Sequence, residues 1–539
     1  MNAIRPTSVA AATPVIDDPR RRRAILLAVC IALMSVVASV SGLNVAQPQL
    51  SDTFSASQGQ VLWIINTYTL TLAALLLPLG AVGDRWGRKP TLLLGLAVFG
   101  IANIAAAVAP GIEFMLGARM LAGVGAAMIM PVTLSVITAS FPDGERSKAI
   151  GVWTAVAGGG GILGMYLSAL LVDIATWRWL FALPIALTAA AAVIAARSVP
   201  NSREYDAGRY DIIGASTSII AVVGLTYALH EAPSVGWSDV SIMGVLAVTV
   251  IAAAVFIVWE LRTPAPLLDV RHFRKRSLSS GSTLLLVLFG VQAGVSLVLY
   301  PFFQIILGWS GLLSTLAMMP MAVLMMLASG LAPKLAARSG ARVTMAAGLL
   351  VAGIGLALMA LLVSADGGYL PVLPGLIAMG LGAGLAMTPS TEAITSSLPR
   401  EQQGVASALN DLTRELGAAL GVALLGGLLT AGYQAAIDPK LVGLPQAVAD
   451  TAREGLANAA AVSGNAGAQA EQLATAAQES FVTGWQQAMW VGVAVMAVLF
   501  VYVLLRGPKP ASLLDDTEPN EQRPEQVAQK SARSANNER

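Results

Sequence analysis

The residues best suited to chemistry in this chain are two acids and a base within an otherwise apolar segment. Asp411 and Glu415 lie four residues apart, and Arg414 directly precedes the second acid. In a helix that begins near Gly404, the rise of 1.5 Å per residue puts the two carboxylates roughly 10 and 16 Å along the axis, on one face. Two close, desolvated carboxylates each favour the neutral form of the other, which a proton carrier requires. The segment therefore predicts a site of proton coupling that can also contact a cationic substrate.

Arg414 decides between two interpretations of these acids. If its side chain turns toward Asp411, that carboxylate stays ionised and the pair is structural. If it points elsewhere, both acids can titrate. A third interpretation is that the start of the helix keeps all three charged side chains near the lipid headgroups.

A second charge inside an apolar segment is Arg119, within residues 114–137. An arginine in the bilayer costs about 2.5–3.5 kcal/mol on insertion scales, so we expect it to face a cavity or a partner carboxylate and to orient a polar network. The alternative is that it extends to the nearer membrane surface, because it lies only about 7–8 Å along the helix.

The composition excludes most other chemistry. Of the 539 residues, 56% are hydrophobic and 12% are charged, which rules out an ordinary soluble globular protein. One cysteine and two histidines leave too few ligands for a metal site or a histidine-based active site. We therefore expect no enzyme activity and no cofactor, with a proton gradient as the energy source. A net charge of +2 gives no strong field for binding nucleic acid.

Apolar runs set the topology, because a membrane-spanning helix needs roughly 20 apolar residues. Fourteen candidate helices span 24–43, 61–82, 91–108, 114–137, 149–172, 177–196, 212–229, 242–259, 278–300, 311–332, 343–363, 370–388, 404–429 and 485–505. The sequence thus predicts an all-α integral membrane protein that crosses the lipid bilayer fourteen times.

We expect these helices to form two bundles of six with an inserted pair between them. The predicted parts are an amino-terminal segment 1–23, a first bundle 24–196, the inserted pair with its linkers 197–277, a second bundle 278–505 that includes an extracytoplasmic loop 431–484, and a tail 506–539. The loop is expected to hold one or two amphipathic helices broken at Ser463-Gly464, either as a solvated connector or as a lid. The charged tail without aromatic residues predicts disorder.

Cationic residues set the orientation, because Lys and Arg are retained on the cytoplasmic side. With the amino terminus inside, 28 of the 33 Lys and Arg residues are cytoplasmic, three are outside and two lie within helices. Both termini are therefore predicted to be cytoplasmic, in a cell membrane. We expect the first helix to stay uncleaved, because no small-residue cleavage site follows its apolar run.

A short motif occurs twice. The segment 80–89 after the second predicted helix is matched by 333–342 after the tenth, 253 positions later, and both contain Arg-x-Gly and a closing cation. Each copy follows the second helix of a six-helix set. Repetition of a six-helix unit in the same orientation, with the substrate path between the halves, is an architecture of secondary transporters.

On these residues the chain resembles the major facilitator superfamily, and within it the fourteen-helix drug:proton antiporters that include quaternary-ammonium exporters. The motif G-x-x-x-D-R-x-G-R-K at Gly80–Lys89 carries the most specific likeness. Leu116–Ala127 resembles the family's second motif, whose arginine, here Arg119, is linked to proton transfer. Pro266–Arg274 resembles the fourteen-helix subfamily in particular. The resemblance implies the major facilitator fold.

The resemblance also implies that the first motif is a latch between the bundles on the cytoplasmic side. Its glycines let two helices approach closely, and Asp84 can accept hydrogen bonds from a helix N-terminus or an arginine. Its arginines can bridge to acids of the other bundle. The alternative is a simple positive-inside anchor. The members of this latch motif are Gly80, Asp84, Arg85, Gly87, Arg88 and Lys89.

The chain departs from the family pattern on several helices. Ser39 stands where the family's first helix carries an acid. Asn66 and Met325 stand where the quaternary-ammonium exporters carry acids on helices two and ten. On the fifth helix only the first glycine of the antiporter signature survives, and Gly160 and Gly164 are expected to allow close packing there.

The sequence therefore predicts a monomeric transporter that exports small amphipathic organic compounds, such as drugs, by proton-coupled alternating access, and that would confer antibiotic resistance. Ser39, Asn44, Asn66 and Tyr68 are expected to line its cavity. Three alternatives stay open. The missing acids favour export of neutral or anionic metabolites or lipids, the incomplete fifth-helix signature fits a symporter or uniporter, and the long loop and tail fit a membrane sensor that transports nothing.

Overall fold

The computed structural model describes residues 16–202, 210–399, 402–464 and 469–508. These ranges contain fourteen helices that are long and apolar enough to cross a membrane, in agreement with the fourteen apolar runs. They contain no β-strand. The all-α, fourteen-helix prediction is confirmed.

Six spans build the amino-terminal half. They are α1 (Pro19–Val45), α3 (Gln58–Trp86), α4 (Arg88–Ala107), α5 (Ile112–Ser140), α6 (Asp143–Ile174) and the pair η1 (Trp177–Phe181) and α7 (Ala182–Ser198). A short helix that the sequence did not predict, α2 (Gln47–Phe54), follows α1. The inserted hairpin consists of α8 (Ile212–Val235) and α9 (Val240–Glu260).

Six spans build the carboxy-terminal half, after the short turn η2 (Val270–Arg274). They are α10 (Arg276–Pro301) with η3 (Phe302–Ile306), α11 (Gly311–Ala317) with α12 (Met319–Ser339), α13 (Ala341–Leu362), α14 (Leu373–Thr395), α15 (Gln403–Ile437) and α18 (Ala470–Arg506).

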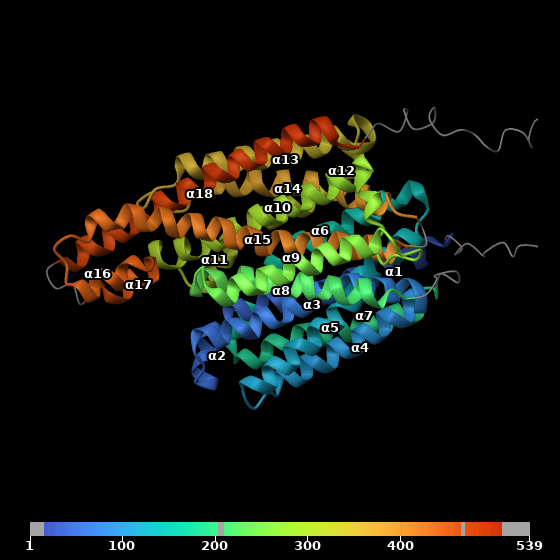
Figure 1. Ribbon diagram of the computed structural model, residues 1–539, viewed down its shortest axis with the longest axis horizontal. Helices are drawn as coiled ribbons and strands as arrows, with labels where there is room; N and C mark the ends of the chain where they lie inside the picture. The colour runs from blue at the N-terminus through green and yellow to red at the C-terminus, as the bar shows by residue number, and fades with distance from the viewer. Residues whose placement is uncertain (1–15, 203–209, 400–401, 465–468, 509–539) are drawn as a thin grey trace, which may run out of the picture.

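The two halves lie side by side with their helices roughly parallel (Figure 1). The blue and cyan helices of the amino-terminal half occupy the lower part of the view, and the yellow to red helices of the other half occupy the upper part. The green hairpin of α8 and α9 lies between them, and α8 packs against both α3 and α15. The hairpin therefore touches both halves.

The sequence repeat is also a repeat of backbone conformation. A single residue, Gly87, separates α3 from α4, and a single residue, Gly340, separates α12 from α13. Their φ angles are +112° and +87°, in a region that only glycine enters without strain. The motif is thus a one-residue break between two helices. The position that matches Asp84 in the second copy is Ala337, so only one copy carries an acid.

The predicted loop 431–484 was too long. α15 continues to Ile437 and α18 already begins at Ala470, so the connector between them is shorter and contains helices of its own. These are η5 (Asp438–Lys440), α16 (Gln446–Arg453) and α17 (Leu456–Val462). In Figure 1 they form the left end of the molecule.

Packing explains why the helices extend beyond the apolar runs. Leu473 and Phe481 of α18 lie in the core of the carboxy-terminal half, although the Gln and Glu residues beside them lower the local hydropathy. The Tyr433 hydroxyl of α15 donates a hydrogen bond to the Ala452 carbonyl oxygen at 2.7 Å, which ties α16 to the long helix. At the other end α1 begins at Pro19, within the predicted segment 1–23. Most of the tail predicted to be disordered, from residue 509 on, lies outside the described residues.

Glycines let α10 and α15 cross almost backbone to backbone. A Cβ atom added to Gly421 would overlap the Gly290 carbonyl group, whereas one added to Gly427 on the same helix would meet nothing within 4 Å. We predict that Gly421→Ala lowers stability by about 1–3 kcal/mol, the usual cost of overpacking. Thermal unfolding of the purified proteins in detergent measures this, with Gly427→Ala as the matched control. Equal melting temperatures for the two variants would contradict the crossing.

Candidate functional site

The first half of α15 lies between the two bundles. Ala408 and Leu409 belong to the core of the carboxy-terminal half, but Leu412 belongs to the core of the amino-terminal half. α15 packs against α3 and α5 of that half. The polar residues of this stretch are therefore held where the two bundles meet.

Asp84, near the end of α3, binds the start of α15. The backbone N–H of Gly404 donates to Asp84 Oδ1 at 2.9 Å and to Oδ2 at 2.7 Å, and that of Val405 donates to Oδ2 at 3.3 Å. Arg88 forms an ion pair with the same carboxylate at 3.1 Å. A carboxylate at a helix N-terminus satisfies orphan N–H groups and interacts favourably with the helix dipole. Both kinds of partner predicted for Asp84 are thus present.

Two glycines allow this contact. A Cβ atom on Gly80 would lie 2.7 Å from the Gly404 carbonyl oxygen, and one on Gly404 would lie 2.7 Å from Asp84 Oδ2. The absence of a side chain on Gly80 and Gly404 lets α3 and α15 approach closely, which brings the Asp84 carboxylate within hydrogen-bonding distance of the α15 backbone.

The other cations of the latch motif bind elsewhere. The Arg85 guanidinium lies 5.3 Å from the centre of the Tyr210 ring, at the start of the inserted hairpin. Lys89 Nζ donates to the Ala196 carbonyl oxygen of α7 at 2.7 Å. The motif therefore connects α3 to the hairpin and to α7 as well as to α15.

Asp411 is completely buried and only partly satisfied. Asn410 Nδ2 donates to its Oδ1 at 3.2 Å, whereas Oδ2 has no hydrogen-bond partner. Its side chain is 0% exposed and that of Arg414 is 8% exposed. Both side chains therefore lie inside the protein, and their depth relative to the lipid headgroups stays a prediction.

Arg414 is shared between the acid and the other bundle. Its Nη1 lies 3.7 Å from Asp411 Oδ1, a long ion pair, while Nη2 donates to the Ala157 carbonyl oxygen of α6 at 3.1 Å. The guanidinium also lies 4.4 Å from the ring centre of Phe289 and 5.7 Å from that of Trp153. Arg414 thus turns toward Asp411 and also binds α6, two arrangements that the sequence left as alternatives. It therefore neutralises Asp411 only in part.

Glu415 lies one turn further along α15 and is half-buried. It is close enough to Arg414 and to the Tyr68 hydroxyl to interact with both electrostatically. The acids of α15 are thereby brought near the polar cluster of the amino-terminal half.

That cluster forms around Arg119, which is 0% exposed and does not extend to the surface. Its Nη1 donates to Ser39 Oγ at 3.0 Å and its Nε to the Ile64 carbonyl oxygen at 3.4 Å. Its guanidinium lies 4.3 Å from the centre of the Tyr68 ring. Ser39 Oγ in turn donates to Asn103 Oδ1 at 3.2 Å. No acid of the described chain lies within ion-pair distance of Arg119, so the partner carboxylate expected from the sequence is replaced by neutral acceptors.

The predicted cavity-lining residues differ in their surroundings. Tyr68 is fully buried, and its hydroxyl donates to the Val36 carbonyl oxygen at 3.3 Å. Ser39 is bound to Arg119, and Asn66 is half-buried on the same helix as Tyr68. The side chain of Asn44 lies outside what the structure describes. Whether a substrate reaches these residues stays a prediction.

The two α6 glycines pack against α1. A Cβ atom on Gly164 would lie 2.8 Å from the Ala38 Cα atom, and one on Gly160 would lie 3.0 Å from Met34 Sδ. This is the close packing that was predicted for these two glycines.

Several residues at the bundle interface could not have been selected from the sequence. Trp153 and Phe289 hold the Arg414 guanidinium, and neither belongs to a recognisable motif. The Ser147 hydroxyl of α6 donates to the carboxylate of Glu392 on α14. Glu392 is the only acid of α14 (Leu373–Thr395), but it lies beyond the predicted apolar run 370–388, so the sequence offered no signal for it.

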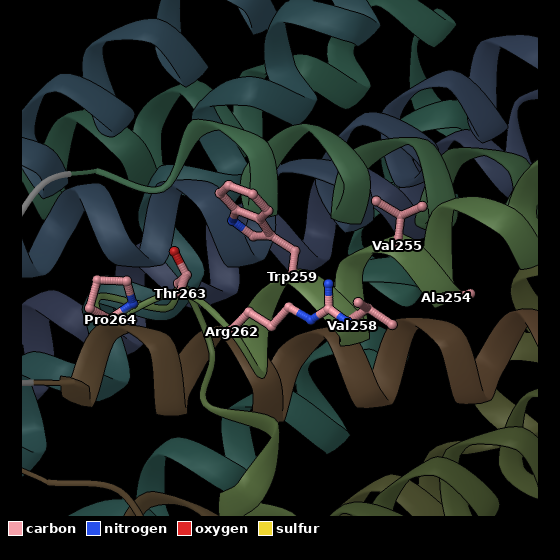
Figure 2. Close-up of a pocket in the computed structure, with 7 residues that line it drawn as sticks. All are labelled: Ala254, Val255, Val258, Trp259, Arg262, Thr263 and Pro264. Carbon is pink, nitrogen blue, oxygen red and sulfur yellow. The ribbon is translucent and has the colours of Figure 1, made fainter.

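A surface pocket lies away from this interface. Figure 2 shows residues at the end of α9 and just after it that line the pocket, among them Val258, Trp259 and Arg262. None of the predicted site residues lines it.

The Asp84 contact gives a prediction about the latch. Asp84→Asn replaces a charged acceptor and removes the Arg88 ion pair, and hydrogen bonds to charged groups contribute about 1.5–3 kcal/mol. Since about 1.4 kcal/mol corresponds to a factor of ten, we expect roughly tenfold faster alkylation of a cysteine placed at buried Ser407 in a Cys30→Ser background. Asp239→Asn is the matched control, because Asp239 also accepts a backbone N–H at a helix start, on α9. Equal alkylation rates in the Asp84 and Asp239 variants would disprove the latch.

Comparison with known proteins agrees with this architecture. The family model described as Major Facilitator Superfamily matches residues 29–422. The multidrug resistance protein Stp of Mycobacterium tuberculosis (strain CDC 1551 / Oshkosh) is 30% identical over 489 residues, which cover 88% of this chain and 90% of Stp. The multidrug efflux pump LfrA of Mycolicibacterium smegmatis is 31% identical over 473 residues, which cover 86% of this chain and 92% of LfrA.

Solved structures share the fold. The human organic anion transporter MFSD10 aligns with a TM-score of 0.57 and 14% identity, over 89% of this chain and 100% of that one. A bacterial homologue of the human lysosomal transporter Spinster aligns with a TM-score of 0.56 and 17% identity, over 91% of this chain and 98% of that one.

Proposed function

The chain belongs to the major facilitator superfamily, and on that premise we propose that it exports amphipathic organic compounds from the cytoplasm in exchange for protons. The pathway lies between the two bundles. The cytoplasmic ends of the bundles, which the latch joins, and their extracytoplasmic ends open in alternation. The names of Stp and LfrA, a multidrug resistance protein and a multidrug efflux pump, support drugs as the substrate class.

The observation that carries this proposal is the buried, incompletely satisfied carboxylate of Asp411 at the bundle interface. Burial without full hydrogen bonding disfavours an ionised carboxylate, and Arg414 offsets this only through a 3.7 Å ion pair. A proton that binds Asp411 weakens that pair and leaves Arg414 held by the α6 carbonyl of Ala157. Proton binding at Asp411 thereby changes what joins the bundles, which is how a proton gradient can drive their rearrangement.

Orientation follows from the cationic latch motif. We place the Gly80–Lys89 end in the cytoplasm, because Lys and Arg are retained on that side. The Asp84 contact then closes the cytoplasmic end. Both ends of the chain lie on that side of the cell membrane, and the α16–α17 connector lies outside.

A second candidate function is export of neutral or anionic compounds. It is favoured by Arg119, a buried cation without a carboxylate partner in the described chain, since such a cation attracts an anionic group that reaches it.

Proteoliposomes loaded with an internal pH dye test the coupling directly. A proton gradient is imposed while the fluorescence of a lipophilic cation is followed together with internal pH. Coupled movement of cation and protons supports cation:proton antiport. If correctly folded protein moves no cation, a panel of neutral and anionic compounds decides for the second candidate, and flux in the direction of the protons indicates a symporter.

We predict that the double variant Asp411→Asn, Glu415→Gln loses proton-dependent export, with a fall of at least about tenfold, because the proton sites are removed while the size of the side chains is kept. The protein should still reach the membrane. The control is Asp450→Asn, Glu471→Gln, which neutralises two exposed acids of the connector and of the start of α18. Undiminished export in the α15 double variant would disprove the assignment of Asp411 and Glu415 as proton sites.

Substrate charge is tested at Ser39. Because Ser39 Oγ lies 3.0 Å from Arg119 Nη1, Ser39→Asp should place a carboxylate against the guanidinium. We expect export of anionic compounds to fall roughly tenfold relative to export of cations, in line with about 1.4 kcal/mol per factor of ten. Ser39→Ala is the control, since it removes the hydroxyl without adding charge. An unchanged ratio of anion to cation export would show that Arg119 does not select the substrate.

A further inference from the structure

The inserted hairpin carries two buried acids where its two helices meet, at the latch end. Asp211 caps the start of α8, and its Oδ1 accepts from the Gly214 backbone N–H at 2.8 Å and from Trp259 Nε1 at 2.9 Å. Glu260 is the last residue of α9, and its Oε2 accepts from the Leu268 backbone N–H at 3.2 Å. One oxygen of each carboxyl group is thus satisfied by the protein.

The other oxygen of each carboxyl group is buried without a hydrogen-bond partner. Asp211 is 7% exposed and Glu260 is 0% exposed, and the unpaired atoms are Asp211 Oδ2 and Glu260 Oε1. Both point at Gly214. A Cβ atom on Gly214 would lie 2.6 Å from Asp211 Oδ2 and closer still to Glu260 Oε1. The two oxygens therefore lie within about 5 Å of each other.

The charged groups around the pair do not neutralise it. Asp269 acts on Glu260 with the same sign, and Asp269 is itself paired with His272 and Arg271 at 3.7 and 3.9 Å. From α3, the Arg85 guanidinium lies over the ring of the neighbouring Tyr210. In the part of the chain that the structure describes, no Lys or Arg forms an ion pair with Asp211 or Glu260.

Two ionised carboxylates this close, buried and without an ion-pair partner among the described residues, repel each other strongly, and one proton between them removes the repulsion. It also satisfies both unpaired oxygens, because a protonated carboxyl group is a donor and an ionised one an acceptor. A hard metal ion fits poorly, because Ca²⁺ takes six to eight oxygen ligands and the described residues contain no group of three or more acidic, His or Cys side chains that could hold a metal.

We propose that Asp211 and Glu260 form a proton-binding site in the inserted hairpin, in which the Glu260 carboxyl group donates to Asp211 Oδ2. The site is separate from the acids of α15 and does not depend on the proposed coupling.

The position of the site indicates what its proton controls. Next to Asp211, the Tyr210 hydroxyl donates to the Pro78 carbonyl oxygen of α3 at 3.2 Å, and its ring lies under the Arg85 guanidinium of the latch motif. Beyond Glu260, Leu267 and Leu268 lie in the core of the carboxy-terminal half. The acid pair thus lies between Tyr210, which contacts α3, and Leu267 and Leu268, which pack in the carboxy-terminal half. Loss of the proton therefore weakens the attachment of the hairpin to both halves.

Infrared spectroscopy of the purified full-length protein tests the proposal, because a protonated carboxyl group has a C=O stretching band that carboxylates and amides lack. The reference is the Asp411→Asn, Glu415→Gln variant, whose α15 acids cannot contribute. At neutral pH we expect this reference to retain a buried carboxyl band that shifts in deuterium oxide. Adding Glu260→Gln should remove the band, whereas adding Glu471→Gln, an exposed acid, should leave it. A band that survives Glu260→Gln, or that disappears when Na⁺ or Mg²⁺ is added at constant pH, would overturn the proposal.

Thermal unfolding provides a second measurement on the natural sequence. The wild type should melt at progressively lower temperature as the pH rises and the shared proton is lost, since the repulsion then acts in the folded state alone. Glu260→Gln should abolish the part of this fall that the pair causes, because the Gln amide donates to Asp211 Oδ2 at every pH. If Glu260→Gln does not fold, Asp211→Asn serves the same purpose from the other side. A melting profile that neither variant flattens would also disprove the site.

Discussion

The contact on which the arrangement of the two bundles depends is the acceptance of backbone N–H groups at the start of α15 by the Asp84 carboxylate. It joins helices that belong to different halves and lie more than three hundred residues apart in the chain. A helix N-terminus leaves N–H groups unsatisfied, and inside a membrane protein no water replaces a lost partner. The first half of α15 is therefore held against the amino-terminal half as long as Asp84 stays in place, and everything further along that helix is positioned by this anchor.

Arg119, Arg414 and Asp411 lack a full counter-charge, and this distinguishes them from the structural Asp84–Arg88 ion pair. Arg119 donates to a serine and a carbonyl, Arg414 divides its donors between Asp411 and α6, and Asp411 keeps one oxygen without a partner. A fully paired network would hold the bundles in one arrangement. Partners that are neutral or shared between the halves do not hold the bundles in one arrangement in this way.

The inserted hairpin is more than a spacer in this arrangement. It packs on α3 and α15, the same two helices that the latch joins, and its own acids meet at that end of the molecule. The latch motif reaches it through Arg85 and Tyr210. The hairpin thereby adds contacts to both bundles next to the latch.

The sequence by itself determined the number and type of the helices, because crossing a membrane requires long apolar runs and fourteen of them are unmistakable. It also indicated the partners available to Asp84, since these follow from a local motif. The one-residue breaks at Gly87 and Gly340 came from the structure, because the predicted apolar runs end several residues away from both glycines. The sequence predicted helices within the loop 431–484 but misjudged where α15 ends and α18 begins, because packing of a partly polar sequence extends both helices and hydropathy carries no signal there. Only the tertiary structure decided that Arg119 meets Ser39, that Arg414 is shared with α6, and that Asp211 faces Glu260. Such contacts join residues far apart in the chain, and their geometry is fixed by how the helices cross.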